Sequence, residues 1–306
     1  MATSVVGAVG TVLAASFVVF AALGFAPGDP VAQILGQKAT EAERVAMRAQ
    51  LGLDKPLLVR YWDWLTGVLH GDFGLSLTYR QDVTLLLGPR VSATLVLVAM
   101  SAVITLVVGV LLGTVGGVSA RWRPLVNGLA GLGTAVPGFV AAVLLISVFA
   151  VGLGWFPTYG AGNGFGDQLW HLALPAVALS MAWAAYIAQI TTASVTEEAG
   201  KEHVATAIGR GLPRLLVIRR HVLRNAFIPV LTVSGLMVGG LVAGSVVVEN
   251  AFGIDGLGSL LVKGVLNKDY AVVNAVSLII VVVFVVVTTV VDLVHTALDP
   301  RLRERT

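Results

Sequence analysis

The chain of 306 residues contains no cysteine and few charged residues. The absence of cysteine excludes disulfides, thiolate catalysis, cysteine-ligated zinc and iron–sulfur clusters. Charged residues make up 12% of the chain and hydrophobic residues 57%, whereas soluble domains have about 25% and roughly 45–50%. Disordered segments, in contrast, are rich in charge and poor in aliphatic side chains. The composition therefore excludes an ordinary cytosolic enzyme and a disordered chain, and its net charge of +3 fits the orientation of a membrane protein better than nucleic-acid binding.

Six stretches are long and apolar enough to cross a bilayer, which takes about 20 residues in a helix. They are 5–25, 92–118, 126–151, 169–192, 230–248 and 272–294. The first lacks the basic segment and cleavage site of a signal peptide, so we expect a retained anchor. A short basic turn separates the second from the third, and His171, Pro175 and Gln189 interrupt the fourth. The sequence predicts an all-α polytopic membrane protein with six transmembrane helices.

The predicted spans contain almost no ionisable side chain. Only His171 and Asp292 come close, and each lies near a helix end where a charge can reach water, so we interpret both as structural. Carriers driven by protons or sodium need buried carboxylates, histidines or unwound ion sites at mid-depth. The chain also has no HExxH motif, no paired aspartates in a span and no ATP-binding P-loop. Any uphill transport must therefore draw its energy from elsewhere.

Uncharged polar side chains in the spans are the candidates to line a solute path. They are Thr134, Ser180, Gln189, Ser234, Ser245, Asn274 and Ser277. Such a lining can pass a polar solute, but it lacks the carboxylate or imidazole ligands that a naked divalent cation requires. We therefore predict no metal site.

Basic residues are distributed unevenly between the segments on the two sides of the membrane. One side holds Arg121, Arg123, Lys201, Arg210, Arg214, Arg219, Arg220, Arg224, Arg301, Arg303 and Arg305. The short loops of the other side, 152–168 and 249–271, hold only Lys263 and Lys268. The positive-inside rule places segment 193–229 and both termini in the cytoplasm. The expected organisation is a first helix with an outer segment (1–91), a transmembrane core (92–295) and a cytoplasmic tail (296–306).

The outer segment, 26–91, contains signals for two helices. Thr40 followed by Glu43 is typical of a capping box at a helix start. A second helix carries Tyr61, Trp62 and Trp64, rings that settle at the headgroup level of a bilayer. Within the spans, small residues recur at three- and four-residue spacing, as at Gly109 and Gly113, and indicate close helix packing.

Segment 197–229 carries the most informative pattern. It is expected to form a short helix, a break at Gly209–Pro213 and an amphipathic basic helix. An element of this kind between two spans suits a docking surface for a soluble partner. A basic juxtamembrane loop can also simply contact anionic lipid, and composition leaves both possibilities open.

The segment resembles the EAA loop of ABC-importer permeases, in the form of the dipeptide/oligopeptide/nickel branch. Ala205, Thr206 and Ala207 occupy the EAA positions, Gly211 the family glycine, and His221–Ala226 and Pro229 follow. The literal Glu198–Ala199 lies upstream and is interpreted as coincidental. Further motifs are similar to the same branch in order: APGDP at 26–30, LGLDKP at 51–56, GDFGLS at 71–76, GWFP at 154–157, HLALP at 171–175, VENAF at 248–252 with GLG at 256–258, Asp269–Tyr270 and LDPR at 298–301. Each motif is weak alone, but their common order over nearly the whole chain is specific.

The resemblance implies the permease subunit of an ATP-driven importer in the bacterial inner membrane. Its partners are a second homologous permease, an extracytoplasmic solute-binding protein and two cytoplasmic ATPases, which bind the ATP and magnesium. The chain itself would be no enzyme and would hold no cofactor. The residues implied to couple it to the ATPases are Ala205, Thr206, Ala207, Gly211, Leu212, Pro213, Arg214, Arg219, Arg220, His221, Arg224 and Asn225.

The outer segment and loop 249–271 would receive the binding protein. Glu249, Asp255 and Asp269 are expected to supply negative charge there, although loop acids are often only solvated. Di- or oligopeptides are the expected solutes, with nickel chelates or glutathione-like compounds as the alternative. A self-contained channel or secondary carrier remains as an alternative of another class, and a membrane-embedded enzyme is disfavoured by the missing catalytic motifs.

Overall fold

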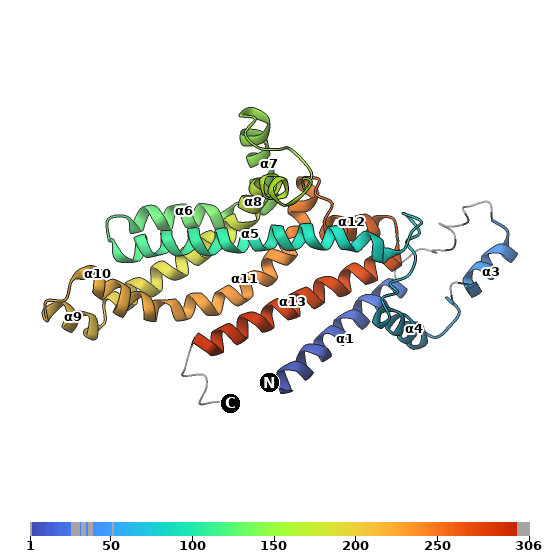
Figure 1. Ribbon diagram of the computed structural model, residues 1–306, viewed down its shortest axis with the longest axis horizontal. Helices are drawn as coiled ribbons and strands as arrows, with labels where there is room; N and C mark the ends of the chain where they lie inside the picture. The colour runs from blue at the N-terminus through green and yellow to red at the C-terminus, as the bar shows by residue number, and fades with distance from the viewer. Residues whose placement is uncertain (1, 26–30, 32–34, 36–38, 51, 299–306) are drawn as a thin grey trace. The chain divides into compact units, whose positions relative to one another are not determined.

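The computed structural model describes residues 2–25, 31, 35, 39–50 and 52–298. Motif 26–30 and residues 299–301 of the last motif lie outside the described residues. The helices are α1 (Ala2–Gly24), α3 (Glu41–Gln50), α4 (Leu57–Leu69), α5 (Val83–Val118), α6 (Arg123–Ala135), α7 (Gly138–Leu145), α8 (Phe165–Ala199), α9 (Glu202–Gly209), α10 (Arg214–Val217), α11 (Arg224–Ala251), α12 (Leu257–Leu266) and α13 (Tyr270–Leu298), with π-helical segments η1 (Ile146–Gly152) and η2 (Ile218–Leu223) (Figure 1). The predicted all-α architecture is confirmed.

Five helical runs among the described residues are long and apolar enough to cross a membrane. They are Val6–Gly24, Val83–Val118, Phe165–Ala199, Arg214–Ala251 and Tyr270–Val290. These five coincide with predicted spans and extend several of them. The fourth span continues through Pro175, which removes one backbone donor but does not end the helix.

The predicted span 126–151 is not one straight helix. It consists of α6 and of α7 with η1, and these two parts meet at an angle of 100°. The bend follows from Pro137, because the residue before a proline is driven out of the α conformation. Val136 accordingly adopts an extended backbone with φ −83° and ψ 118°. The expectation of a continuous helix here was wrong, and the number of spans is six only if the bent pair is counted as one.

Contacts within the chain define two compact units, Met1–Ser92 with Asp255–Val285, and Ala93–Ile254 with Val286–Thr306. In the first unit, Val83, Leu86 and Leu87 of α5 pack against α12 and α13. In the same unit, the Tyr61 hydroxyl on α4 lies 2.8 Å from the Ser16 hydroxyl on α1.

The predicted capping box is present: the backbone N–H of Thr40 donates to Glu43 Oε2 at 2.8 Å, and the Glu43 N–H to Thr40 Oγ1 at 3.4 Å.

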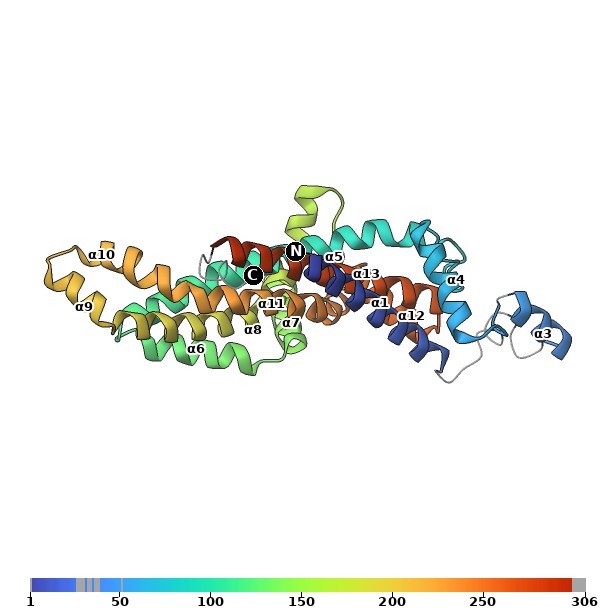
Figure 2. The ribbon, with the colours of Figure 1, turned by 90° about the horizontal axis from the view of Figure 1, so that it is seen from below.

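In the second unit, α8 packs against both α6 and α11 and lies between them in Figure 2. Its contact with α5 depends on glycine. A Cβ added at Gly113 would lie 2.4 Å from Thr191 Cβ, and one at Gly117 would lie 2.5 Å from Val195 Cβ. The close approach lets the Thr192 hydroxyl donate to the Gly113 carbonyl at 3.2 Å. The prediction that small residues serve helix packing is confirmed for these positions.

Candidate functional site

The candidate site is the element between the two spans α8 and α11, at their shared end in Figure 1. The predicted short helix is α9, and the predicted break follows it at residues 210–213. The basic helix after the break is not separate, because α10, η2 and α11 form one helical run, Arg214–Ala251. The spans thus reach further into segment 193–229 than expected, and only residues 200–213 connect them.

Gly211 ends α9 through its backbone. Its φ is +77°, a conformation that side-chain-bearing residues adopt only under strain, and nothing lies within 4 Å of the position of an added Cβ. The Gly211 N–H donates to the Ile208 carbonyl at 2.9 Å and the Leu212 N–H to the Ala207 carbonyl at 3.3 Å. These two bonds form a Schellman motif, which Pro213 follows directly. Gly211 therefore serves the turn by its left-handed backbone and not by a close approach.

An apolar cluster fixes α9 to both neighbouring spans. It consists of Val195, Val204, Ala207, Val217, Val222 and Ala226, which come from α8, α9, α10, η2 and α11. All six are buried. Ala207 is the member of the EAA-like triplet that faces inward, whereas Ala205 and Thr206 are exposed.

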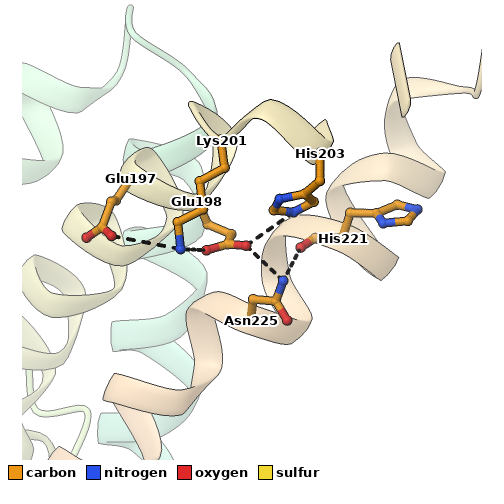
Figure 3. A network of polar contacts seen from close by, with 6 residues as sticks. All are labelled: Glu197, Glu198, Lys201, His203, His221 and Asn225. Carbon is orange, nitrogen blue, oxygen red and sulfur yellow. Dashed lines mark hydrogen bonds and ion pairs between the residues drawn. The ribbon is translucent and has the colours of Figure 1, made fainter. Parts of the chain in front are cut away.

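The carboxylate of Glu198 is the centre of a polar network (Figure 3). Its Oε1 accepts a hydrogen bond of 2.8 Å from Asn225 Nδ2 and lies 3.3 Å from His203 Nε2. Its Oε2 binds the Lys201 ammonium group. The hydrogen bond from Lys201 to Glu198 raises the pKa of Lys201 above its usual value of 10.5. The predicted site residue Asn225 thus contacts Glu198, whose match to the EAA pattern we had interpreted as coincidental. The sequence signal for this network was an acid three residues before a lysine at a helix end.

The exposed surface of the segment between α8 and α11 combines apolar and basic side chains. Ile208, Leu212, Leu215 and Leu216 are exposed although they are apolar. The predicted residues Pro213, Arg214, Arg219, Arg220 and Arg224 are exposed too, and His221 is half-buried. The predicted coupling residues are therefore brought together on one element. The exposed leucines and isoleucine were missed because an apolar residue in an apolar chain gives no distinctive signal.

The seven candidates for a solute path lie on α6, α8, α11 and α13. Four of them donate to a carbonyl of their own helix: Thr134 to Ala130, Ser180 to Val177, Ser234 to Val230 and Ser245 to Val242. Asn274, which is buried, and Ser277, half-buried, belong to the first unit. Gln189 alone of the seven lines a recess of about 540 Å³, together with Arg123, Asn127, Thr192, Ala193, Thr196 and Glu197.

Two of the three acids expected on the outer surface are in the interior. Glu249 is fully buried and accepts a hydrogen bond of 2.7 Å from the Thr94 hydroxyl. Asp269 is also fully buried and accepts bonds from the Ser76 hydroxyl at 2.6 Å and the Thr78 N–H at 3.0 Å. The expectation that these two present charge to a partner was wrong, because each is buried and accepts hydrogen bonds from groups far away in the sequence. Asp255 is exposed and pairs with Lys263 at 3.1 Å.

Sequence comparison identifies the family. Residues 106–304 match the model of the binding-protein-dependent transport system inner membrane component, and residues 1–81 match the model of the N-terminal part of such membrane components. The glutathione transport system permease proteins GsiC of Salmonella choleraesuis (strain SC-B67) and Escherichia coli (strain K12) are 37% identical to this chain over 299 residues, which cover 97% of it and 96% of each relative.

The fold has a solved counterpart. A chain of the MetNI methionine ABC transporter in an inward-facing conformation matches with a TM-score of 0.59 and 20% sequence identity. The match covers 70% of this chain and 96% of that one. At this identity the likeness concerns the fold alone. The family models and the 37% identical relatives show that the chain belongs to the binding-protein-dependent family of inner membrane transport components, as a permease subunit of a bacterial ABC importer of the dipeptide/oligopeptide/nickel kind.

Proposed function

We propose that this permease imports short peptide-like solutes of the glutathione kind. The observation that carries the proposal is the 37% identity, over nearly the whole of both chains, to permeases named for glutathione transport. Glutathione is itself a short peptide. The proposal therefore stays within the predicted class of peptide solutes and adopts the glutathione-like compounds that were the alternative. The uncharged polar residues of the spans support a peptide better than a bare metal ion, which would require carboxylate or imidazole ligands.

We further propose that the ATPases dock on α9 and the turn after it. Exposed Ile208 and Leu212 offer apolar area, and Arg214 adds a charge that can pair with an acidic surface. The basic residues of the segment support a cytoplasmic location for this surface and for both termini. ATP and magnesium would bind to the partners and supply the energy there.

The connection of this surface to the spans supports a lever mechanism. The apolar cluster around Val204 and Ala207 ties α9 to α8. The turn at Gly211 leads directly into the helical run Arg214–Ala251, so a displacement at α10 passes into α11 without an intervening loop. Movement of a docked ATPase would then tilt α8 and α11 together and open the path alternately to each side. In this scheme, segment 1–91 and loop 249–271 receive the binding protein, 92–295 forms the path with a second permease, and 296–306 is a cytoplasmic tail.

Reconstitution tests the proposed solute. The permease is incorporated into vesicles with its second permease, two ATPases and binding protein, and uptake of labelled glutathione, a dipeptide and a nickel chelate is compared with and without ATP. We expect ATP-dependent uptake with glutathione preferred. Preference for nickel chelates would contradict the solute class, and uptake by the purified chain alone without ATP would favour the channel or carrier alternative.

A single substitution tests the docking surface. Ile208→Glu places a charge on the exposed apolar face of α9, and Leu58→Glu places one on an exposed position of α4 as the control. The substitution removes an apolar contact and buries a charge in the interface. This costs at least about 1.4 kcal/mol of binding free energy, which is a tenfold loss of affinity. We expect ATPase co-purification to fall about tenfold for Ile208→Glu alone. Equal co-purification for both variants would contradict docking on α9.

A further inference from the structure

Glu198 has an environment that is unusual for a carboxylate. It lies in the last turn of α8 with only 5% of its surface exposed, whereas the side chain of its neighbour Glu197 is 79% exposed. Burial of a charge is costly unless the charge is paired and hydrogen-bonded. An apolar residue at this buried position would avoid that cost, so the carboxylate requires an explanation.

Both oxygens of the carboxylate are engaged, and their partners come from different elements. Lys201 lies in the connection after α8, His203 in the first turn of α9, and Asn225 in the first turn of α11. The Asn225 amide also donates to the His221 carbonyl at 3.2 Å, which fixes the amide to its own helix. One side chain therefore joins the end of α8, the helix α9 and the helical run Arg214–Ala251, as Figure 3 shows.

These contacts and the apolar cluster differ in what they can fix. Apolar packing attaches α9 to the spans but is not directional. Hydrogen bonds to a charged group are directional and specify geometry. A buried ion pair is weak evidence for stability, and its best-attested use is to fix one arrangement among several. The cluster that includes Val195, Val204 and Val222 already attaches α9 to its neighbours, so the directional contacts of the carboxylate are suited to set the angle of α9.

We propose that Glu198 is a positioning residue that locks α9 to α8 and α11, so that movement of a docked ATPase reaches both spans. The proposal rests on the docking at α9 proposed above. Without this lock, α9 remains attached by its apolar side but pivots, and ATP is hydrolysed without a matching movement of the spans. The expected defect is uncoupling and not loss of assembly.

Spin labels test the lock without any solute. The cysteine-free chain permits Glu202→Cys on α9, outside the predicted coupling residues, and Leu236→Cys on α11, both exposed positions. The distance distribution between the two labels is measured in the assembled complex for the parent, Glu198→Ala and the matched control Glu197→Ala. We expect the distribution to broaden for Glu198→Ala and to stay unchanged for Glu197→Ala. A distribution that Glu198→Ala leaves as narrow as that of the parent overturns the proposal.

Transport by the same variants, without labels, provides the second readout. We expect glutathione uptake per ATP hydrolysed to fall about fivefold or more in Glu198→Ala, in the range of ordinary coupling between sites. Glu198→Asp, which keeps the charge, should recover part of the ratio. A fall in uptake that merely follows lost complex, with an unchanged ratio, would assign Glu198 a stabilising role only and overturn the proposal. If the parent complex takes up no glutathione, the proposed solute is wrong, while the spin-label distances still decide the lock.

Discussion

Single residues in the segment between α8 and α11 owe their roles to backbone and charge more than to size. Gly211 has a positive φ in open space, which glycine adopts without strain; the residue type alone left a close approach of the backbone equally possible. Glu198 and Lys201 form an ion pair at the end of α8, and the pair holds the lysine in its charged form. As long as Glu198 is ionised, the raised pKa of Lys201 means that the stabilisation by the pair is complete below about pH 10.5 and is lost as the pH rises through the higher folded value.

The raised pKa of Lys201 makes a testable difference in chemical reactivity. Amine-acylating reagents attack the neutral amine, so Lys201 should react more slowly than an unpaired lysine at pH 8 to 10. In Glu198→Gln the carboxylate is gone, and the acylation rate of Lys201 is expected to rise towards the unpaired value. Mass spectrometry of the labelled complex measures the rate, with Lys55, which pairs with Asp63 outside this network, as an internal control. An unchanged rate for Lys201 in the variant would contradict the importance of the pair.

At the scale of helices, the contact between α5 and α8 is set by the absence of side chains. The Cβ positions of Gly109, Gly113 and Gly117 would each lie under 3.0 Å from atoms of α8. The close approach brings the Gly113 carbonyl within hydrogen-bond distance of the Thr192 hydroxyl, and Arg123 of α6 donates to the carbonyls of Gly116 and Gly117. Small residues are the usual means by which helices approach one another in a membrane, where the hydrophobic effect does not drive them together.

Substitution of one of these glycines should therefore separate the two helices. In Gly113→Ala the new methyl group would meet Thr191 Cβ at 2.4 Å and the Ala188 carbonyl at 2.7 Å, and backbone atoms cannot yield cheaply. Overpacking of this kind costs about 1–3 kcal/mol, so the thermal unfolding midpoint of the detergent-solubilised chain should fall. Gly128→Ala on α6 is the matched control, because nothing lies within 4 Å of its Cβ position and alanine favours a helix by about 1 kcal/mol. Equal midpoints for Gly113→Ala and the parent would refute the packing role.

Local signals explain which elements could be predicted. The capping box of Thr40 and Glu43 and the turn before Pro213 depend on neighbours within a few residues, and both were found. The bend at Pro137 was local as well, but the continuous apolar run around it favoured a single helix. Glu249 and Asp269 were misplaced because their partners, Thr94 and Ser76, lie 155 and 193 positions away and only folding brings them together.

At the scale of the whole molecule, the function rests on a division of labour. Among the described residues the spans carry few ionisable groups, and the family to which the chain belongs works with separate membrane and binding-protein components. The basic residues, in contrast, gather in the segment that contains α9 and α10. The lever proposed for this segment requires that it faces the cytoplasm, since the ATPases are there.

The absence of native cysteine makes this orientation directly measurable. Arg210→Cys places a thiol on the exposed turn after α9, and Tyr159→Cys places one on the exposed loop between η1 and α8. Because the positive-inside rule assigns these two segments to opposite sides, a membrane-impermeant maleimide should label Tyr159→Cys in intact spheroplasts. The same reagent should label Arg210→Cys only in inverted vesicles, and the cysteine-free parent gives the background. The reverse pattern would place α9 outside the cell, where no ATPase can reach it, and would remove the physical basis of both the docking surface and the Glu198 lock.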